Sequence, residues 1–138
     1  MADRSDLIIQ YFGYLISDYK YTVSEKRFDP QMMGNAFVVF LSLRIGIEIV
    51  IDRDQVLITL GDREEPKEKW FDFTDVLHYF SPSKIAYSDV DQLFNEKRAK
   101  YSSIEDTWKE VIKEQLHRLA FMLREYCEPI ISGNLEME

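Results

Sequence analysis

Two short patterns place a carboxylate and a histidine at helical spacing, which is an arrangement from which metal sites are built. Asp75 and His78 are three residues apart, and so are Glu114 and His117. Carboxylate-bridged di-iron bundles use Glu-x-x-His twice, together with glutamates from two other helices. Here one pattern begins with Asp, and the middle of the chain predicts strands rather than long helices. The patterns therefore indicate solvated helix faces, and the sequence predicts no metal site.

Other reactive side chains are few. The chain has two histidines and one cysteine, Cys127, which falls in a series of apolar residues at helical spacing. We therefore expect Cys127 to be a core side chain rather than a nucleophile. The sequence contains no G-x-S-x-G, phosphate-binding loop, G-x-G-x-x-G or H-E-x-x-H motif. It predicts no catalytic residue and no cofactor.

A charged loop followed by aromatic residues is the strongest candidate for a binding site. Residues 61–69 read GDREEPKEK, and WFDF follows them. Exposed acidic side chains suit a basic partner, and tryptophan is enriched at interface hot spots. We predict a partner-binding site formed by Asp62, Glu64, Glu65, Glu68 and Trp70. The alternatives are a solvated loop and packing of the aromatic rings in the core.

Composition and charge narrow the kind of partner and the compartment. The 138 residues carry a net charge of −8, and 46% of them are hydrophobic, which is enough for one packed core. The acidic balance disfavours nucleic acid and anionic membranes, and favours a basic protein partner. A single cysteine permits no internal disulfide. Because we also find no signal-peptide pattern and no apolar run of about 20 residues, we expect a cytoplasmic protein.

Hydrophobic spacing predicts an N-terminal helix followed by strands. Apolar residues recur with the helical period from 7 to 16, after Ser5 or Asp6 as the cap. Gly13 inside this helix indicates close packing against a neighbour. Residues 19–24 predict a strand, residues 25–35 a connection, and the almost wholly apolar residues 36–43 a central strand.

Residues 45–61, IGIEIVIDRDQVLITLG, predict a β-hairpin. Isoleucines at every second position from 45 to 51 share one face, and Val56, Ile58 and Leu60 continue that face on the return strand. Residues 52–55 supply the turn. The apolar face needs a helix to cover it, whereas antiparallel sheets commonly leave the other face in contact with water.

Helices are predicted for the C-terminal half. The first covers residues 75–80 with Thr74 or Asp72 as its cap, and the second covers residues 89–100. The strongest begins at a capping box after Ser102 or Ser103 and ends at Pro129. The whole chain, 1–138, therefore predicts one α+β domain. It has an N-terminal helix, an antiparallel sheet of three to four strands, and C-terminal helices covering one face, with residues 133–138 as a frayed tail.

The N-terminal half resembles a loose bacterial group of small α+β proteins of unassigned function, some of which are immunity-type proteins of toxin systems. The similar residues are "YFGYLISDYKYTV" and "FVVFLSLRIGIEIVIDRDQVLITLG", between positions 11 and 61. The shared pattern is a helix, Asp-Tyr-x-(Tyr/Phe), a strand with F-V-V-F-x-S and a hairpin with I-E-I-x-x-D-R. Immunity proteins are often small, acidic and cytoplasmic, and they neutralise a toxin by binding it. The resemblance carries over no site residue.

These observations favour a protein-binding module that is immunity-like and that occludes a partner with its acidic loop and the exposed face of its sheet. One alternative is a small-ligand protein or enzyme with a pocket between sheet and helices, using His78 and His117. Another is a structural homodimer formed through a sheet edge or the C-terminal helix.

Overall fold

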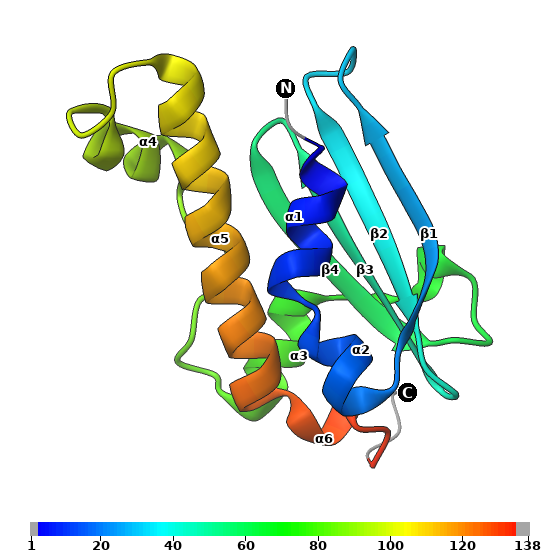
Figure 1. Cartoon of the computed structure of the whole chain (residues 1–138). Coiled ribbons are helices and arrows are strands. Elements are labelled where there is room, and N and C mark those ends of the chain that lie inside the picture. Colours follow the sequence, from blue (N-terminus) through cyan, green and yellow to red (C-terminus); the bar gives the residue numbers. More distant parts are fainter. Residues whose placement is uncertain (1–2, 135–138) are drawn as a thin grey trace.

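Helices pack on one side of a five-stranded antiparallel sheet in the computed structural model, which describes residues 3–134 (Figure 1). The sheet is a meander whose strands lie in chain order, so the α+β prediction is confirmed, but the predicted number of three to four strands was too low because a two-residue strand pairs with the fourth. The elements are α1 (Arg4–Tyr11), α2 (Tyr14–Tyr19), β1 (Thr22–Asp29), β2 (Asn35–Leu41), β3 (Ile45–Asp52), β4 (Gln55–Asp62), η1 (Lys67–Lys69), β5 (Phe71–Asp72), α3 (Phe73–Phe80), α4 (Val90–Arg98), α5 (Ile104–Tyr126) and α6 (Glu128–Ile131). Across the described residues, no helix has the length and apolarity needed to cross a bilayer.

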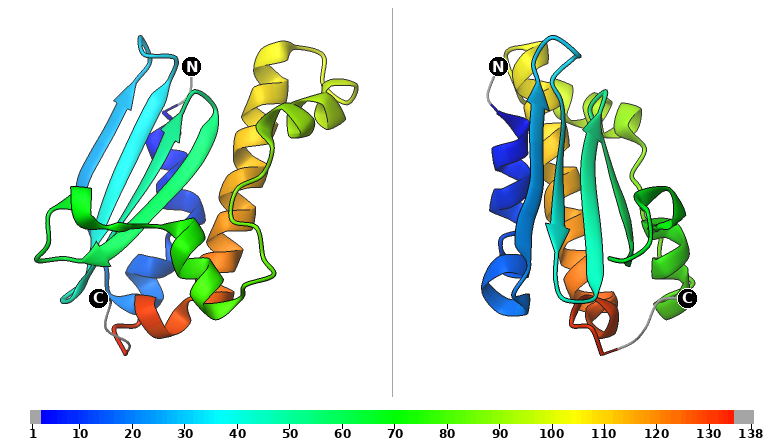
Figure 2. Two further views of the ribbon diagram at one scale, coloured as in Figure 1. Left: turned by 180° about the vertical axis from the view of Figure 1, so that it is seen from behind. Right: turned by 90° about the vertical axis from the view of Figure 1, so that its right-hand side faces the viewer.

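The core lies between the sheet and the helices α1 and α5 (Figure 2). Ile47, Ile49 and Ile51 of β3 point into it, opposite Leu60, Ile58 and Val56 of β4, and all six are fully buried. The predicted isoleucine face is therefore confirmed. The long helix α5 and the N-terminal helices remove this face from water, which is the main favourable contribution to folding.

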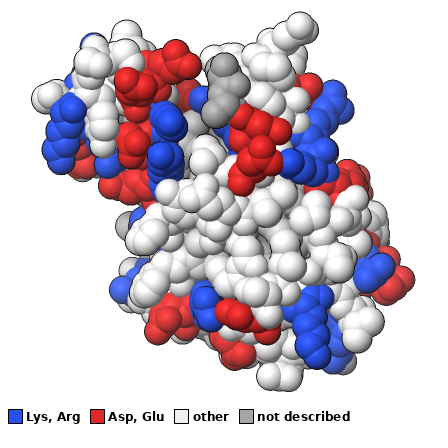
Figure 3. Space-filling model, in the orientation of Figure 1, with Lys and Arg blue, Asp and Glu red and all other residues white. Residues whose placement is uncertain are grey.

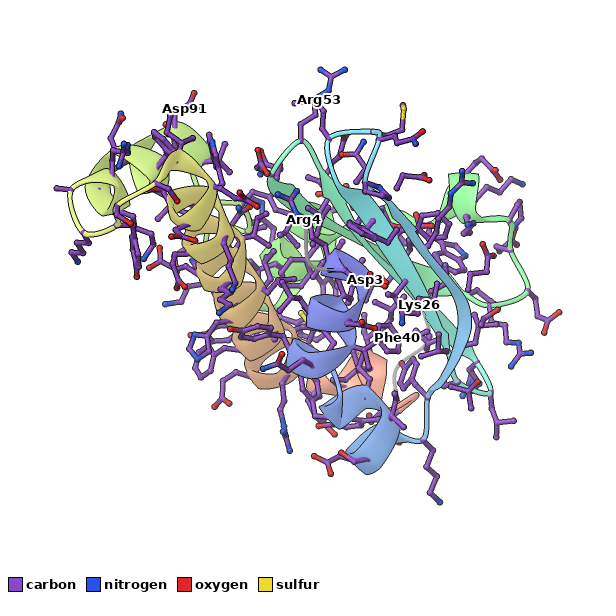
Figure 4. The ribbon with its side chains drawn as sticks, turned by 45° about the horizontal axis from the view of Figure 1, so that its top comes forward. Asp3, Arg4, Lys26, Phe40, Arg53 and Asp91 are labelled. Atoms are coloured by element: carbon purple, nitrogen blue, oxygen red, sulfur yellow. The ribbon has the colours of Figure 1, made fainter. Side chains whose placement is uncertain are left out.

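The turn between β3 and β4 has two consecutive residues in the left-handed region, Arg53 at φ 51° and Asp54 at φ 70°. Positive φ at both central positions matches the right-handed twist of the two strands. Three elements hold this turn: the Arg53 N–H donates to Asn35 (3.0 Å), Arg4 pairs with Asp54 (2.9 Å), and Gln115 donates to the Asp54 carbonyl (2.8 Å). Figure 4 shows Arg53 at the hairpin tip and Arg4 on the adjacent end of α1.

The N-terminal helix is broken in two, which the sequence did not predict. Asp3 caps α1 by accepting from the Ser5 N–H (2.9 Å), whereas Ser5 is itself buried and its hydroxyl bonds the same carboxylate. The helix ends at Tyr11, and α2 starts after Gly13. Because Asp3 is the N-terminal cap of α1, the predicted cap at Ser5 or Asp6 was wrong.

The first strand lies further along the chain than the predicted residues 19–24: Tyr19 ends α2, β1 spans Thr22–Asp29, and only residues 30–34 form the connection. Charged side chains made residues 25–29 resemble a loop. They suit an edge strand: Lys26 pairs with Asp6 of α1, and Arg27 pairs with Asp29 (2.9 Å). Figure 4 shows Lys26 on the side of the sheet that faces α1.

The C-terminal caps follow the prediction more closely. Asp72 caps α3, and the Ser103 hydroxyl accepts from the Asp106 N–H at the start of α5 (3.0 Å). Pro129 does not end α5, which stops at Tyr126, but lies in the short helix α6. Of the predicted frayed tail, the Gly133 carbonyl accepts from Arg44 (3.3 Å), and residues 135–138 lie outside the described residues.

Side chains close the edge of β4 where β5 is too short to pair with it. The Val56 N–H donates to Gln115 (2.9 Å), and the Ile58 N–H donates to the Tyr87 hydroxyl (3.1 Å). Burial raises the pKa of Tyr87, so its hydroxyl keeps the proton that it donates to Asp72 (2.8 Å). At the opposite edge, β1 carries a bulge between Val23 and Glu25 and several charges. Both features oppose pairing with a further strand, so this sheet is poorly suited to an edge-to-edge homodimer.

Candidate protein-docking surface

The side of the sheet that faces away from α1 and α5 carries apolar residues where an antiparallel sheet usually carries polar ones. The strand register aligns Phe37 of β2, Val50 of β3 and Leu57 of β4 in one row across the sheet. All three side chains are half-buried. We call these three residues the outer stripe. It is an apolar surface that the helical layer does not cover.

Two rows that are mostly polar flank the outer stripe, one on each side. Toward the β3–β4 turn, the next row contains Asp29, Asn35, Asp52 and Gln55. In the other direction, the row reads Glu25, Val39, Glu48 and Thr59. An apolar centre with a polar rim is the usual anatomy of a protein interface.

Lys67 covers part of the row that contains Glu25 and Glu48. Its ammonium lies 3.1 Å from Glu48, 3.8 Å from Glu25 and 5.5 Å from the centre of the Phe37 ring. The pKa of Lys67 is raised: partial burial lowers it, but the hydrogen bond and charge of Glu48 and the charge of Glu25 outweigh that effect. Lys67 therefore stays charged, and its ion pairs hold the segment 63–70 against the sheet. We call this segment the strap (Figure 2).

Trp70 anchors the end of the strap on two glycines. A Cβ at Gly46 would lie 2.3 Å from Cη2 of the indole, and a Cβ at Gly61 would lie 2.7 Å from its Cδ1. The indole N–H donates to the carbonyls of Asp62 (2.9 Å) and Glu65 (3.1 Å). Only residues without a side chain leave room for the ring at this depth, so the glycine pair and Trp70 form one packing unit.

The structure places the five predicted partner-binding residues on or beside the strap. Glu64, Glu65 and Glu68 are exposed, whereas Trp70 is half-buried on its glycine floor. The Asp62 carboxylate accepts a hydrogen bond from the Glu64 N–H (2.8 Å) and thereby stabilises the turn that follows β4. Four acidic and three basic residues alternate within residues 61–70, which leaves the loop almost balanced in charge. Its role as an acidic docking site stays a prediction.

The sequence pointed to the exposed face of the sheet as a docking surface, but not to the outer stripe on it or to Glu48 and Lys67 beside the stripe. One signal was present: residues 36–41 are apolar at consecutive positions, and strand side chains alternate between faces. Such a strand must place apolar groups on both sides of its sheet. Val50 and Leu57 likewise fall at positions where the alternation of the hairpin predicts polar residues.

His78 and His117 do not form a buried site. His78 lies on α3 and His117 on α5, and both side chains are exposed. Glu114, the carboxylate of the second pattern, pairs with Lys97 of α4 (3.0 Å). Among residues 3–134, no group of three or more His, Cys, Asp or Glu side chains could hold a metal ion. A pocket reaction that uses both imidazoles has no support in these positions.

The helical side of the molecule has an uncharged area over the middle of α1 and α5 (Figure 3). Tyr14 joins α2 to α5: its hydroxyl donates to the Ala120 carbonyl (2.7 Å), and the Arg124 guanidinium lies 5.1 Å from its ring. These groups already have partners within the fold. Exposed apolar side chains on the helical layer, such as Phe121 (54% exposed), are alternatives to the outer stripe, which differs from them in aligning three apolar residues in one row.

Cys127 is fully buried and free, as the sequence predicts. Burial raises the pKa of its thiol from 9.0 to about 12. Because the thiolate is the reactive form, we expect a disulfide-exchange reagent at pH 8 to label the folded protein at least about a hundredfold more slowly than the unfolded protein. The measurement is labelling by Ellman's reagent with and without denaturant. Equal rates in the two conditions would show that the thiol is accessible in the folded state.

Comparison with known proteins found no matching family model, no matching curated protein and no matching solved structure.

Proposed function

We propose that this chain is a protein-binding module whose docking surface is the outer stripe. The observation that carries the proposal is the alignment of Phe37, Val50 and Leu57 on the sheet face away from the helices. When a partner covers apolar groups that are in contact with water, the free energy of the system falls, which favours binding. The strands hold them rigidly, so little conformational entropy is lost on binding.

The mode of action that we propose is occlusion. A domain that docks through a rigid sheet face covers the corresponding surface of its partner and needs no chemistry of its own. The resemblance to immunity-type proteins and the net charge of −8 support the same mode. Charge would accelerate the encounter, and salt would slow it.

Site-specific photo-crosslinking tests the location of the docking surface. We expect p-benzoylphenylalanine in place of Val50 to crosslink a specific partner in lysate of the source cells, because this position lies in the centre of the stripe. The same substitution at Phe121, which is 54% exposed on α5, is the matched control. Mass spectrometry identifies the crosslinked protein. A partner crosslinked from Phe121 but not from Val50 would place docking on the helical layer and contradict the proposal.

A further inference from the structure

We infer that the partner presents a basic amphipathic helix to the outer stripe. This inference rests on the proposed function and names the chemistry of the docking segment. In the complex, the apolar side of the helix lies on Phe37, Val50 and Leu57. Its lysine or arginine side chains reach the carboxylates in the two flanking rows.

The charges beside the stripe are unbalanced. Asp29 and Asp52 lie in the row on one side, and Glu25 and Glu48 lie in the row on the other side. Within the described part of the chain, the cations that pair with these residues are Arg27, at 2.9 Å from Asp29, and Lys67, which is divided between Glu48 and Glu25. Asp52 accepts a long hydrogen bond from Asn35, at 3.4 Å, and pairs with no cation among residues 3–134. The four carboxylates that β1 and β3 contribute to these rows thus face two cations, which leaves an excess of two negative charges beside the apolar centre.

The dimensions of the stripe fit a helix. Neighbouring strands are about 4.8 Å apart, so the stripe extends roughly 10 Å from Phe37 to Leu57. Apolar residues at i, i+3, i+4 and i+7 of a helix cover this length. The stripe runs across the strands rather than along a free edge, so an added strand could not use it. A helix lying along the row fits this direction.

The flanking rows are within reach of cations on such a helix. Each row lies two residues along the strands from the stripe, or about 7 Å. Lysine and arginine can lay their aliphatic stems over apolar surface and extend their charged ends to its margin. An acidic helix in the same place would bring like charges to both margins. The two rows therefore select for a basic segment as well as attracting it.

Two synthetic peptides test the inference. One is an 18-residue amphipathic helix of leucine and lysine, and the other has glutamate at every lysine position. We expect the lysine peptide to shift the backbone amide NMR signals of Phe37, Val50 and Leu57, and the glutamate peptide to leave them unchanged. Shifts confined to the surface of α4 and α5, equal effects of the two peptides, or no binding at millimolar peptide would each overturn the inference.

Charge-matched variants separate a specific margin from the overall charge of the protein. Each of Glu48→Gln and Asp52→Asn should weaken binding of the lysine peptide on the order of threefold, and the two together roughly tenfold. The control pair Glu105→Gln and Glu125→Gln, at exposed positions of α5, removes the same formal charge and should change affinity less than about twofold. Equal losses in both pairs would mean that only net charge matters, which contradicts the inference.

The same variants distinguish failure of this inference from failure of the proposed function. Suppose that the natural partner is lost on Leu57→Asp but binds the double variant Glu48→Gln/Asp52→Asn as tightly as it binds wild type. The outer stripe then remains the docking surface, and the basic helix is wrong. If Leu57→Asp leaves binding unchanged, both proposals fail.

Discussion

Gly46→Ala is expected to expel Trp70 from the sheet and to lower the free energy of unfolding by about 2–3 kcal/mol. An alanine normally stabilises a strand relative to glycine, so the expected sign is opposite to the general trend. The reason is local: the new Cβ would lie 2.3 Å from the indole, whose N–H is held by two backbone carbonyls. The ring cannot retreat without losing those hydrogen bonds and releasing the strap.

A double-mutant cycle isolates this contact. In a Trp70→Ala background the clash is gone, so Gly46→Ala should then cost less than about 0.5 kcal/mol, and the two changes should be strongly non-additive. Urea unfolding measures the free energies. In a Trp108→Phe background, fluorescence reports on Trp70 alone and should shift to longer wavelength in Gly46→Ala. Additive free energies with an unshifted spectrum would show that Trp70 does not pack on Gly46.

Gln115→Ala is expected to lower the free energy of unfolding by about 2–4 kcal/mol. Gln115 is 2% exposed, and its amide joins α5 to two parts of the hairpin. It accepts from the Val56 N–H at the open edge of β4 and donates to the Asp54 carbonyl in the strained turn. Truncation removes both bonds, leaves a buried N–H without its acceptor and opens a cavity.

Gln92→Ala provides the matched control. Gln92 is exposed on α4, where its amide donates to Glu96 (3.1 Å), so the same substitution should change stability by less than about 0.5 kcal/mol. Urea unfolding compares the two variants. Hydrogen exchange at the Val56 amide should accelerate only in Gln115→Ala. Equal stability of the two variants would show that Gln115 does not hold the hairpin.

The inner half of the fold could be predicted from the sequence because its signal is local. Isoleucines at alternate positions and a polar four-residue turn predict the β3–β4 hairpin, and the spacing of apolar residues predicts α5. The predicted boundary of β1 was wrong, because the charged residues of this segment favour a loop whereas its position at the edge of the sheet permits a strand. The charges at Glu25, Lys26 and Arg27 resemble a loop, yet an edge strand tolerates them because its side chains meet solvent or an ion partner.

The outer face could not be predicted, because it depends on contacts between distant segments. The residues next to Gly46 in the sequence do not predict that the indole of Trp70 packs on this glycine. In the same way, the sequence predicts Lys67 to be one of several charges in a solvated loop, whereas in the structure the strap places it beside Glu48 and Glu25. The site predicted from the loop therefore names residues close to the proposed docking surface. It gives Trp70 an exposed role, whereas the ring packs on Gly46 and Gly61 and anchors the strap.

The most direct test of the central claim is the affinity of the crosslinked partner, once purified, for three forms of the protein. Isothermal titration calorimetry compares wild type, Leu57→Asp on the outer stripe and Phe121→Asp on the helical layer, each first shown to unfold at the same urea concentration. We predict that Leu57→Asp weakens binding at least about a hundredfold, because it buries an unpaired carboxylate at the interface, and that Phe121→Asp leaves the affinity unchanged. The reverse result, with Phe121→Asp abolishing binding and Leu57→Asp binding as wild type does, would contradict the assignment of the outer stripe as the docking surface.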